Sequence, residues 1–181
     1  MGMFCFAINQ QERRTNMDTK TNLIITRVFD APRDLVWKAW TDPEHIKHWW
    51  APRPYQTPEC EIELRPGSKF YTLMTGPEGF HEAGTACILE AVPGERIVWT
   101  SALGEGYRPN EFPPEGCGAF PFTAIHTFED AGGGKTRYTA TVLHRNAADR
   151  DAHAAMGFQD GWGTCADQLG EVARELATAN A

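Results

Sequence analysis

The sequence predicts an α+β domain, in which a curved antiparallel sheet of about seven strands wraps round a long C-terminal helix and two short helices follow the first strand. Three observations predict this fold. A strand-like segment and two helix-start signals open the domain, short alternating segments between Gly- and Pro-containing turns follow, and the last third has a helical period. A strongly curved sheet covered by one helix leaves space between the layers, so the pattern also predicts an internal cavity.

The first strand is expected over residues 23–30, a run rich in β-branched side chains that ends before Pro32. A short helix follows over residues 33–41, because Pro32 suits a first helical turn and the apolar residues recur at helical spacing. Asp42 then has the position of an N-cap ahead of Pro43 and Glu44, which predicts a second short helix that reaches His48.

From residue 57 the apolar period changes to alternation, with Cys60, Ile62 and Leu64 on one face and glutamates on the other. Further strands are expected over residues 68–75, 81–92, 95–103, 121–129 and 135–145. The last two would form a hairpin about three consecutive glycines. Residues 104–118 are rich in Pro and Gly and predict a long loop, of the kind that often serves as a lid or a binding loop.

The final third predicts one long amphipathic helix that begins after Asn146 as its cap. Four glycines fall inside this pattern, at positions 157, 161, 163 and 170. A glycine in a helix interior costs about 0.5 to 1 kcal/mol relative to alanine. We therefore hypothesise that the stretch 157–163 lets the helix bend or lets a ligand approach its backbone closely.

Composition excludes several classes of protein. The chain has 181 residues and a formal charge of −7, which argues against nucleic acid as the partner. It contains no apolar run near the roughly 18 residues of a membrane span. Five cysteines without a CxxC pair indicate reduced thiols in a cytoplasmic protein. We expect residues 1–21 to form a disordered tail and residues 22–181 to form a single domain. The sequence leaves open whether Met1 or Met17 is the natural start.

Several segments together resemble a known family. They are APRDLVWKAWTDPEHIKHWW, the Pro66-Gly67 turn, GTACILEAVPGERIVWT, FEDAGGGKTRYTAT and MGFQDGW. In this order they are similar to the bacterial homologues of the activator of heat-shock-protein-90 ATPase, within the START/SRPBCC superfamily. The resemblance covers residues 23–177 and implies the helix-grip fold with a cavity between sheet and long helix. It does not fix a ligand, because this superfamily uses the cavity for several purposes.

The histidines are the candidates for acid–base chemistry. His126 and His144 fall on the apolar faces of two neighbouring strands. Each could act as a general acid or base, but we favour the interpretation that each is a core histidine held by hydrogen bonds. If Phe128 pairs with Tyr138, the two histidines lie four residues apart, too far to share a metal. His81 faces either the cavity mouth or solvent. No motif for a nucleotide, a metal or another cofactor occurs in the sequence, and His45 with His48 lack a third ligand.

The leading hypothesis is that a small apolar or aromatic molecule binds in the cavity. The sequence does not identify this molecule. The side chains expected to contact it are Trp50, Phe70, Met74, His81, Trp99, His126, Tyr138, Phe158 and Trp162. An alternative is a polyketide cyclase-like or hydrolase-like enzyme that uses His126 or His81 as general acid/base. A second alternative is a module that stimulates a chaperone ATPase, although the chain lacks room for the additional N-terminal domain of the eukaryotic activators. A homodimer is compatible with the sequence.

Overall fold

Seven antiparallel strands form one curved sheet in the computed structural model, which describes residues 20–113 and 120–179. Of the predicted tail, residues 1–21, only residues 20 and 21 belong to the described part of the chain. The strands are β1 (Asn22–Phe29), β2 (Gln56–Ile62), β3 (Lys69–Thr75), β4 (His81–Val92), β5 (Arg96–Thr100), β6 (Phe122–Gly132) and β7 (Lys135–His144). Their order across the sheet is β1-β7-β6-β5-β4-β3-β2. The first strand, β1, is therefore an edge strand that pairs with the last strand, β7, and β2 forms the other edge.

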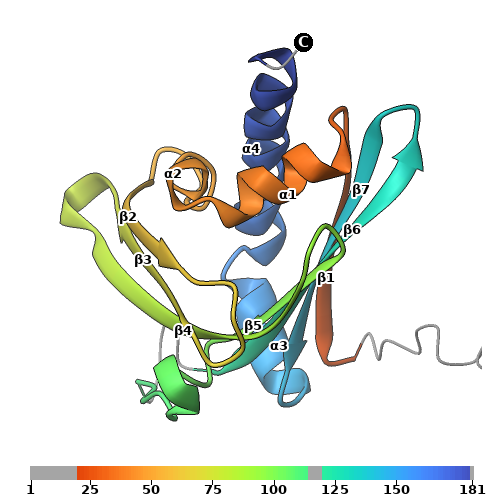
Figure 1. The fold of residues 1–181 in the computed structure, drawn as a ribbon. Helices are drawn as coiled ribbons and strands as arrows, with labels where there is room; N and C mark the ends of the chain where they lie inside the picture. The colour runs from red at the N-terminus through yellow and green to blue at the C-terminus, as the bar shows by residue number, and fades with distance from the viewer. Residues whose placement is uncertain (1–19, 114–119, 180–181) are drawn as a thin grey trace, which may run out of the picture.

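The helices α1 (Arg33–Thr41), α2 (Pro43–Ile46), α3 (Ala147–Ala155) and α4 (Phe158–Ala179) complete the fold, with short 3₁₀ turns at Pro77–Gly79 and Glu105–Tyr107. Figure 1 shows the sheet curving round a hollow side on which α1, α2 and α4 lie. The Asp42 carboxylate accepts a hydrogen bond from the backbone N–H of Glu44 at 2.9 Å, as expected of an N-cap. The α+β helix-grip fold predicted from the sequence is therefore confirmed.

The expectation of a single C-terminal helix is wrong in one respect. The helical pattern is divided into α3 and α4 at Gly157, which has φ +88°. This left-handed conformation is readily adopted only by glycine, and it ends one helix before the next begins. The periodicity missed the break because apolar residues continue at helical spacing on both sides of it.

The register of the β6–β7 hairpin agrees with the sequence-based prediction. Phe128 pairs with Tyr138, His126 with Ala140, and His144 with Phe122. Because side chains alternate across a strand, this register puts both histidines and Tyr138 on the concave face. All three are buried there, with exposed fractions of 8% or less.

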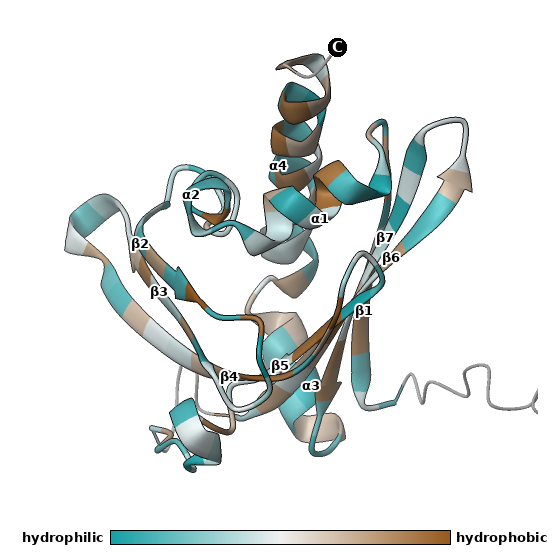
Figure 2. Cartoon of the chain, viewed as in Figure 1, coloured by the Kyte–Doolittle hydropathy of each residue, from teal (hydrophilic) through white to brown (hydrophobic). Residues whose placement is uncertain are grey.

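The core lies between the concave face and the helices. Trp40 of α1 is fully buried and packs against Trp49 and Phe70, with ring centroids 5.9 and 5.8 Å apart. At Gly170, an added Cβ would lie 2.6 Å from the Phe29 ring, so the absence of a side chain lets α4 approach β1 closely. Figure 2 shows hydrophobic and hydrophilic residues alternating along α4, as an amphipathic helix requires.

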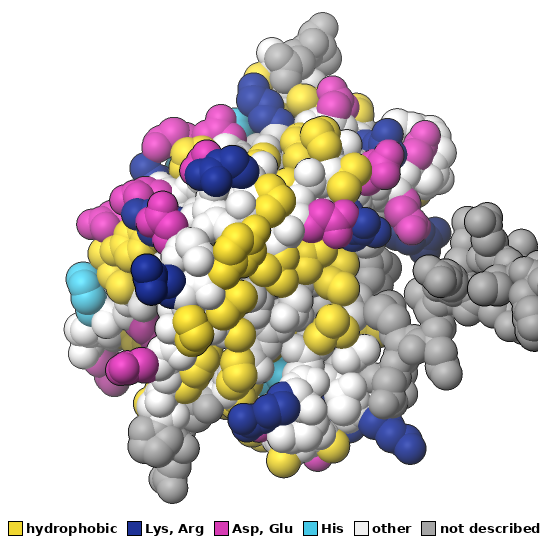
Figure 3. Space-filling view, turned by 60° about the horizontal axis from the view of Figure 1, so that its bottom comes forward, with side chains coloured by type: hydrophobic (Ala, Val, Ile, Leu, Met, Phe, Trp, Pro, Cys, Tyr) yellow, Lys and Arg dark blue, Asp and Glu magenta, His cyan; other side chains and the backbone are white. Residues whose placement is uncertain are grey.

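Charged side chains gather toward the margins of the face shown in Figure 3, and hydrophobic side chains form a band between them. Among the described helices, none is both long and apolar enough to cross a membrane.

Candidate functional site

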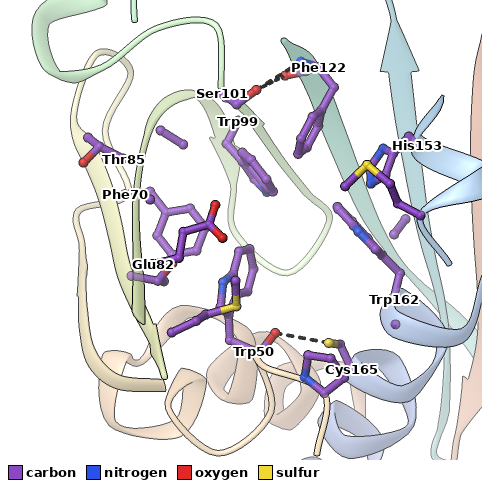
Figure 4. A pocket seen from close by; sticks show the side chains of 18 of the residues that line it. Trp50, Phe70, Glu82, Thr85, Trp99, Ser101, Phe122, His153, Trp162 and Cys165 are labelled. Carbon is purple, nitrogen blue, oxygen red and sulfur yellow. Dashed lines mark hydrogen bonds between the residues drawn. The ribbon is translucent and has the colours of Figure 1, made fainter. Parts of the chain in front are cut away.

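A cavity of about 670 Å³ lies between the concave face of the sheet and the helices. We call it the aromatic cavity, because eight of its lining residues carry indole or phenyl rings: Trp49, Trp50, Phe70, Trp99, Phe112, Phe120, Phe122 and Trp162. Figure 4 shows several of these rings arranged round the space, with Trp162 and His153 on the helical side and Phe70 on the opposite side. Strands β3 to β7 supply most of one wall, and α3 and α4 supply the other.

Seven of the nine residues expected to contact a ligand line this cavity. They are Trp50, Phe70, Met74, Trp99, His126, Tyr138 and Trp162. His81 is exposed at the start of β4, where it pairs with Thr75. The neighbouring pair Met74 and Glu82 faces the cavity, so the alternation of the strand directs His81 to the other face.

Phe158 is the other residue that does not line the aromatic cavity. It is 2% exposed and packs behind the wall, with its ring centroid 5.0 Å from that of His153 and 5.1 Å from that of Trp162. Its contribution to the site is to support these two lining residues.

His126 is held between Trp99 and Tyr138. The Trp99 indole N–H donates to His126 Nε2 at 2.9 Å, and Nδ1 lies 2.8 Å from the Tyr138 hydroxyl oxygen. An indole nitrogen can only donate, so Nε2 is the acceptor and the proton of the neutral ring is on Nδ1. Nδ1–H therefore donates to the Tyr138 oxygen.

This arrangement does not favour His126 as a general base at neutral pH. Burial lowers the pKa of His126 to about 3, since no charge partner offsets the cost of burying an imidazolium. A general base works best with a pKa near the ambient pH and with a lone pair directed at the substrate. Both ring nitrogens are already bonded here, and burial also raises the pKa of Tyr138.

His153 also lines the aromatic cavity, and the sequence reasoning missed it. Its Nδ1 lies 2.9 Å from Nε2 of His144, and Nδ1 of His144 lies 3.1 Å from the backbone oxygen of Thr21. Burial lowers the pKa of His153 to about 4 and lowers that of His144, so both rings are neutral near pH 7. The signal that was available is Asn146 as helix cap, which sets His153 two turns into α3 and next to the end of β7.

The described residues offer no group of three or more His, Cys, Asp or Glu side chains that could hold a metal ion. The two adjacent histidines bond to each other, and His153 also packs against aromatic rings: its ring centroid lies 5.2 Å from that of Phe120 and 5.3 Å from that of Phe122.

Polar residues line part of the cavity on the side of β4 and of the β5–β6 loop. Glu82 and Glu111 are its charged lining residues, and no Lys or Arg occurs among the lining residues that the structure describes. Asn110 is fixed by its side-chain amide, which donates to the backbone oxygens of Thr85 and Ser101 at 2.9 Å each. Asn110, Glu111, Phe112 and Pro113 are the described part of the predicted long loop that lines the cavity, whereas residues 114–119 lie outside the described residues.

Two features of α4 bear on the helical wall. Gly161 lines the cavity, and a Cβ built on it would meet nothing within 4 Å. Cys165 donates through Sγ to the backbone oxygen of Trp50 at 3.1 Å, and burial raises the pKa of this thiol to about 12. Cys165 is therefore an uncharged wall residue and not a reactive thiolate.

Comparisons with known proteins agree with this architecture. Protein NE0264 from Nitrosomonas europaea is 38% identical, with a TM-score of 0.79 over 88% of this chain and 97% of that one. A crystal structure of a protein from Rhodobacter sphaeroides is 23% identical, with a TM-score of 0.72 over 87% and 95% of the two chains. The AHSA1 protein from Silicibacter pomeroyi shares the fold at 15% identity, with a TM-score of 0.62 over 87% and 99%.

No curated protein matches the sequence. The family described as activator of Hsp90 ATPase homolog 1-like protein matches residues 30–174. This match covers most of the domain, from the end of β1 into the last turns of α4. The chain therefore belongs to the family of activator of Hsp90 ATPase homolog 1-like proteins.

Proposed function

We propose that the protein binds a small, uncharged, largely apolar molecule in the aromatic cavity. The observation that carries this proposal is a cavity of about 670 Å³ between the sheet and the helices, lined largely by core side chains and opening to solvent beside β4. Ligand pockets occupy about 300 to 1,000 Å³, and protein interiors without a ligand function rarely leave such space unfilled. Empty volume also destabilises a core, by about 24 cal/mol per Å³ in large-to-small substitutions.

The walls favour a ligand with a flat ring system. Trp50 lies edge-on to Phe70, with centroids 4.8 Å apart, and Trp99 is stacked with Trp162 at 6.5 Å. Aromatic pairs prefer these edge-to-face and offset arrangements, which a planar guest can extend. The ring faces thus offer a large apolar contact area with little side-chain entropy to lose.

The electrostatics favour a ligand without a negative charge. The charged side chains that line the cavity within the described residues are the carboxylates of Glu82 and Glu111, and Figure 4 shows Glu82 near Phe70 and Trp50. The buried histidines supply no cation at neutral pH, because burial lowers the pKa of His126 and His153. An anionic ligand would lose its hydration without gaining a counterion.

Fluorescence titration with 1-N-phenylnaphthylamine, a neutral aromatic dye, tests the proposal directly. Saturable binding at one site per chain is expected, with quenching of tryptophan emission. Gly161→Phe adds a ring where the wall is open and should abolish binding, whereas Gln159→Phe, an exposed change two residues earlier, should leave it intact. Native mass spectrometry of the protein purified from its own host should show a co-purifying small molecule. The absence of dye binding by a folded protein would contradict the proposal.

A further inference from the structure

The hydrogen-bonding groups that line the aromatic cavity restrict the polar atoms that a ligand can carry. This inference rests on the proposed binding function and deepens it. Two lining residues, Tyr138 and His153, each hold one hydrogen-bonding position that no described residue uses. Whether each position is a hydrogen-bond donor or an acceptor follows from two groups with a fixed role, the Trp99 N–H, which only donates, and the Thr21 backbone oxygen, which only accepts.

The Tyr138 position is a donor. Its hydroxyl oxygen accepts the proton of His126 Nδ1, because the Trp99 indole occupies Nε2 as a donor. The hydroxyl proton must therefore point elsewhere. The Trp40 indole also lies against this hydroxyl, but its N–H can only donate, so no described residue accepts the proton. Tyr138 is 3% exposed, so bulk water does not satisfy this proton.

The His153 position is an acceptor. The Thr21 backbone oxygen can only accept, so Nδ1 of His144 carries a proton and donates to it. Nε2 of neutral His144 then holds a lone pair, and Nδ1–H of His153 donates to that lone pair. Nε2 of neutral His153 is left as a lone pair without a described donor.

Trp162 lies close to both positions. The Trp162 ring centroid is 6.3 Å from that of His126, which holds Tyr138, and 6.1 Å from that of His153. The Tyr138 hydroxyl bonds to His126, which pairs with Ala140, and His153 bonds to His144; along β7, Ala140 and His144 are four residues apart on one face, or about 13 Å between Cα atoms at strand spacing. A ligand that meets both positions must therefore extend along the Trp162 face.

We infer that the ligand is an uncharged, elongated molecule with a ring-containing body, a hydrogen-bond acceptor such as a carbonyl oxygen at the Tyr138 hydroxyl, and a hydrogen-bond donor such as a hydroxyl at Nε2 of His153. The body lies among the aromatic walls. Leaving a buried donor or acceptor unpaired costs about 1 to 3 kcal/mol, so a fully apolar ligand fits this cavity less well than one with both groups.

Four neutral probes on one scaffold test the inference by displacement of 1-N-phenylnaphthylamine. They are biphenyl, 4-acetylbiphenyl, 4-hydroxybiphenyl and 4-acetyl-4′-hydroxybiphenyl. Each matched polar group should tighten binding about two- to tenfold relative to biphenyl, which is the range of one net hydrogen bond. Biphenyl-4-carboxylic acid, which places an anion in the same scaffold, should bind more weakly than biphenyl.

Substitutions assign each gain to its residue. Tyr138→Phe should remove the gain of the acetyl group, measured as the ratio of the affinities for 4-acetylbiphenyl and biphenyl in the same variant. His153→Asn keeps an N–H where Nδ1 stands but removes the Nε2 acceptor, so it should remove the gain of the hydroxyl group. His153→Gln restores an acceptor near the Nε2 position and should recover that gain.

A measurement on the unliganded wild-type protein tests the same inference and does not depend on the folding of any variant. Two-bond ¹⁵N–¹H correlation spectra distinguish the imidazole tautomers, and they should show the Nδ1–H form for His126, His144 and His153. An Nε2–H tautomer at His126 or His153 would overturn the inference. So would equal affinities for all four neutral probes. Failure of biphenyl and all its derivatives to displace the dye would instead contradict the binding function itself.

Discussion

The indole nitrogen of Trp99 donates a hydrogen bond of 2.9 Å to Nε2 of His126 inside the core. The two residues lie on neighbouring strands, where Trp99 pairs with Ala124 and His126 pairs with Ile97, so the bond runs diagonally across β5 and β6. It fixes the tautomer of His126 and thereby the direction of the next bond to Tyr138. The Trp99 N–H and both ring nitrogens of His126 are satisfied in one chain of hydrogen bonds that ends on the Tyr138 oxygen, and the second bond depends on the first.

Tyr138→Phe should lower the free energy of unfolding by about 1 to 3 kcal/mol, because it leaves the buried Nδ1–H of His126 without an acceptor. Urea denaturation followed by tryptophan fluorescence measures this loss. Tyr71→Phe is the matched control, since its hydroxyl donates to Glu59 at the surface, at 3.1 Å. That change should stay within about 0.5 kcal/mol of wild type. Equal losses in the two variants would argue against a structural role for the buried chain.

Acid should destabilise the protein through its buried histidines. Burial lowers the pKa of His126 to about 3 and that of His153 to about 4. The unfolded chain therefore binds more protons than the folded one below the ordinary histidine pKa, and the free energy of unfolding falls as the pH falls. Each of these histidines should contribute about 2 kcal/mol of loss between pH 7 and pH 5. Denaturation curves across this range measure it.

His153→Gln removes one of these titrating groups and should make the loss between pH 7 and pH 5 shallower by about 2 kcal/mol. His81→Gln is the control, because His81 is exposed at the start of β4. That variant should follow the wild-type slope. Parallel slopes for wild type and His153→Gln would show that His153 binds protons equally in the folded and unfolded chain, which would contradict a pKa lowered by burial.

Most of the fold could be predicted from the sequence because its signals are local. Alternation of apolar residues defined the strands, Asp42 and Asn146 cap helices through their side chains, and the Phe128–Tyr138 register follows from the glycine hairpin. The division at Gly157 could not be predicted from periodicity. A glycine with positive φ and a helical glycine look alike in a hydrophobic pattern, and only the backbone conformation separates Gly157 from Gly161.

The site could be predicted only in part, because its polar groups are paired over long distances in the sequence. The strand period was enough to place His126 and Tyr138 on the concave face. The contact between His144 and His153 depends on how α3 packs on β7, which no local pattern encodes. For His81, alternation along β4 permitted either face until its register against β3 was known.

Gly161 and Gly170 should respond in opposite ways to alanine. At Gly161 the added Cβ meets nothing within 4 Å, so Gly161→Ala should stabilise α4 by up to about 1 kcal/mol. The methyl group enters the aromatic cavity, so the affinity for 1-N-phenylnaphthylamine should fall. At Gly170 the Cβ would lie 2.6 Å from Phe29, and Gly170→Ala should destabilise by about 1 to 3 kcal/mol. Unchanged stability and unchanged dye affinity in Gly161→Ala would contradict a role for this glycine in the site.

Asn110 should control how fast a ligand leaves. Its amide donates to the backbone oxygens of Thr85 and Ser101, which ties the described part of the β5–β6 loop to the strands beside the cavity. Asn110→Asp replaces both donors by a carboxylate that faces two carbonyl oxygens, so the loop should detach and the dissociation rate of 1-N-phenylnaphthylamine should rise about tenfold or more. Stopped-flow displacement measures this rate.

Glu111→Gln is the control for that experiment, because Glu111 also lines the cavity but makes no side-chain hydrogen bond to a described residue. Its dissociation rate should stay near wild type, and its association rate for a neutral dye should not change, since no charge on the dye interacts with the lost carboxylate. A rate increase in Asn110→Asp alone would show that the loop limits ligand release. Equal rates in all three proteins would contradict a role of this loop in ligand release.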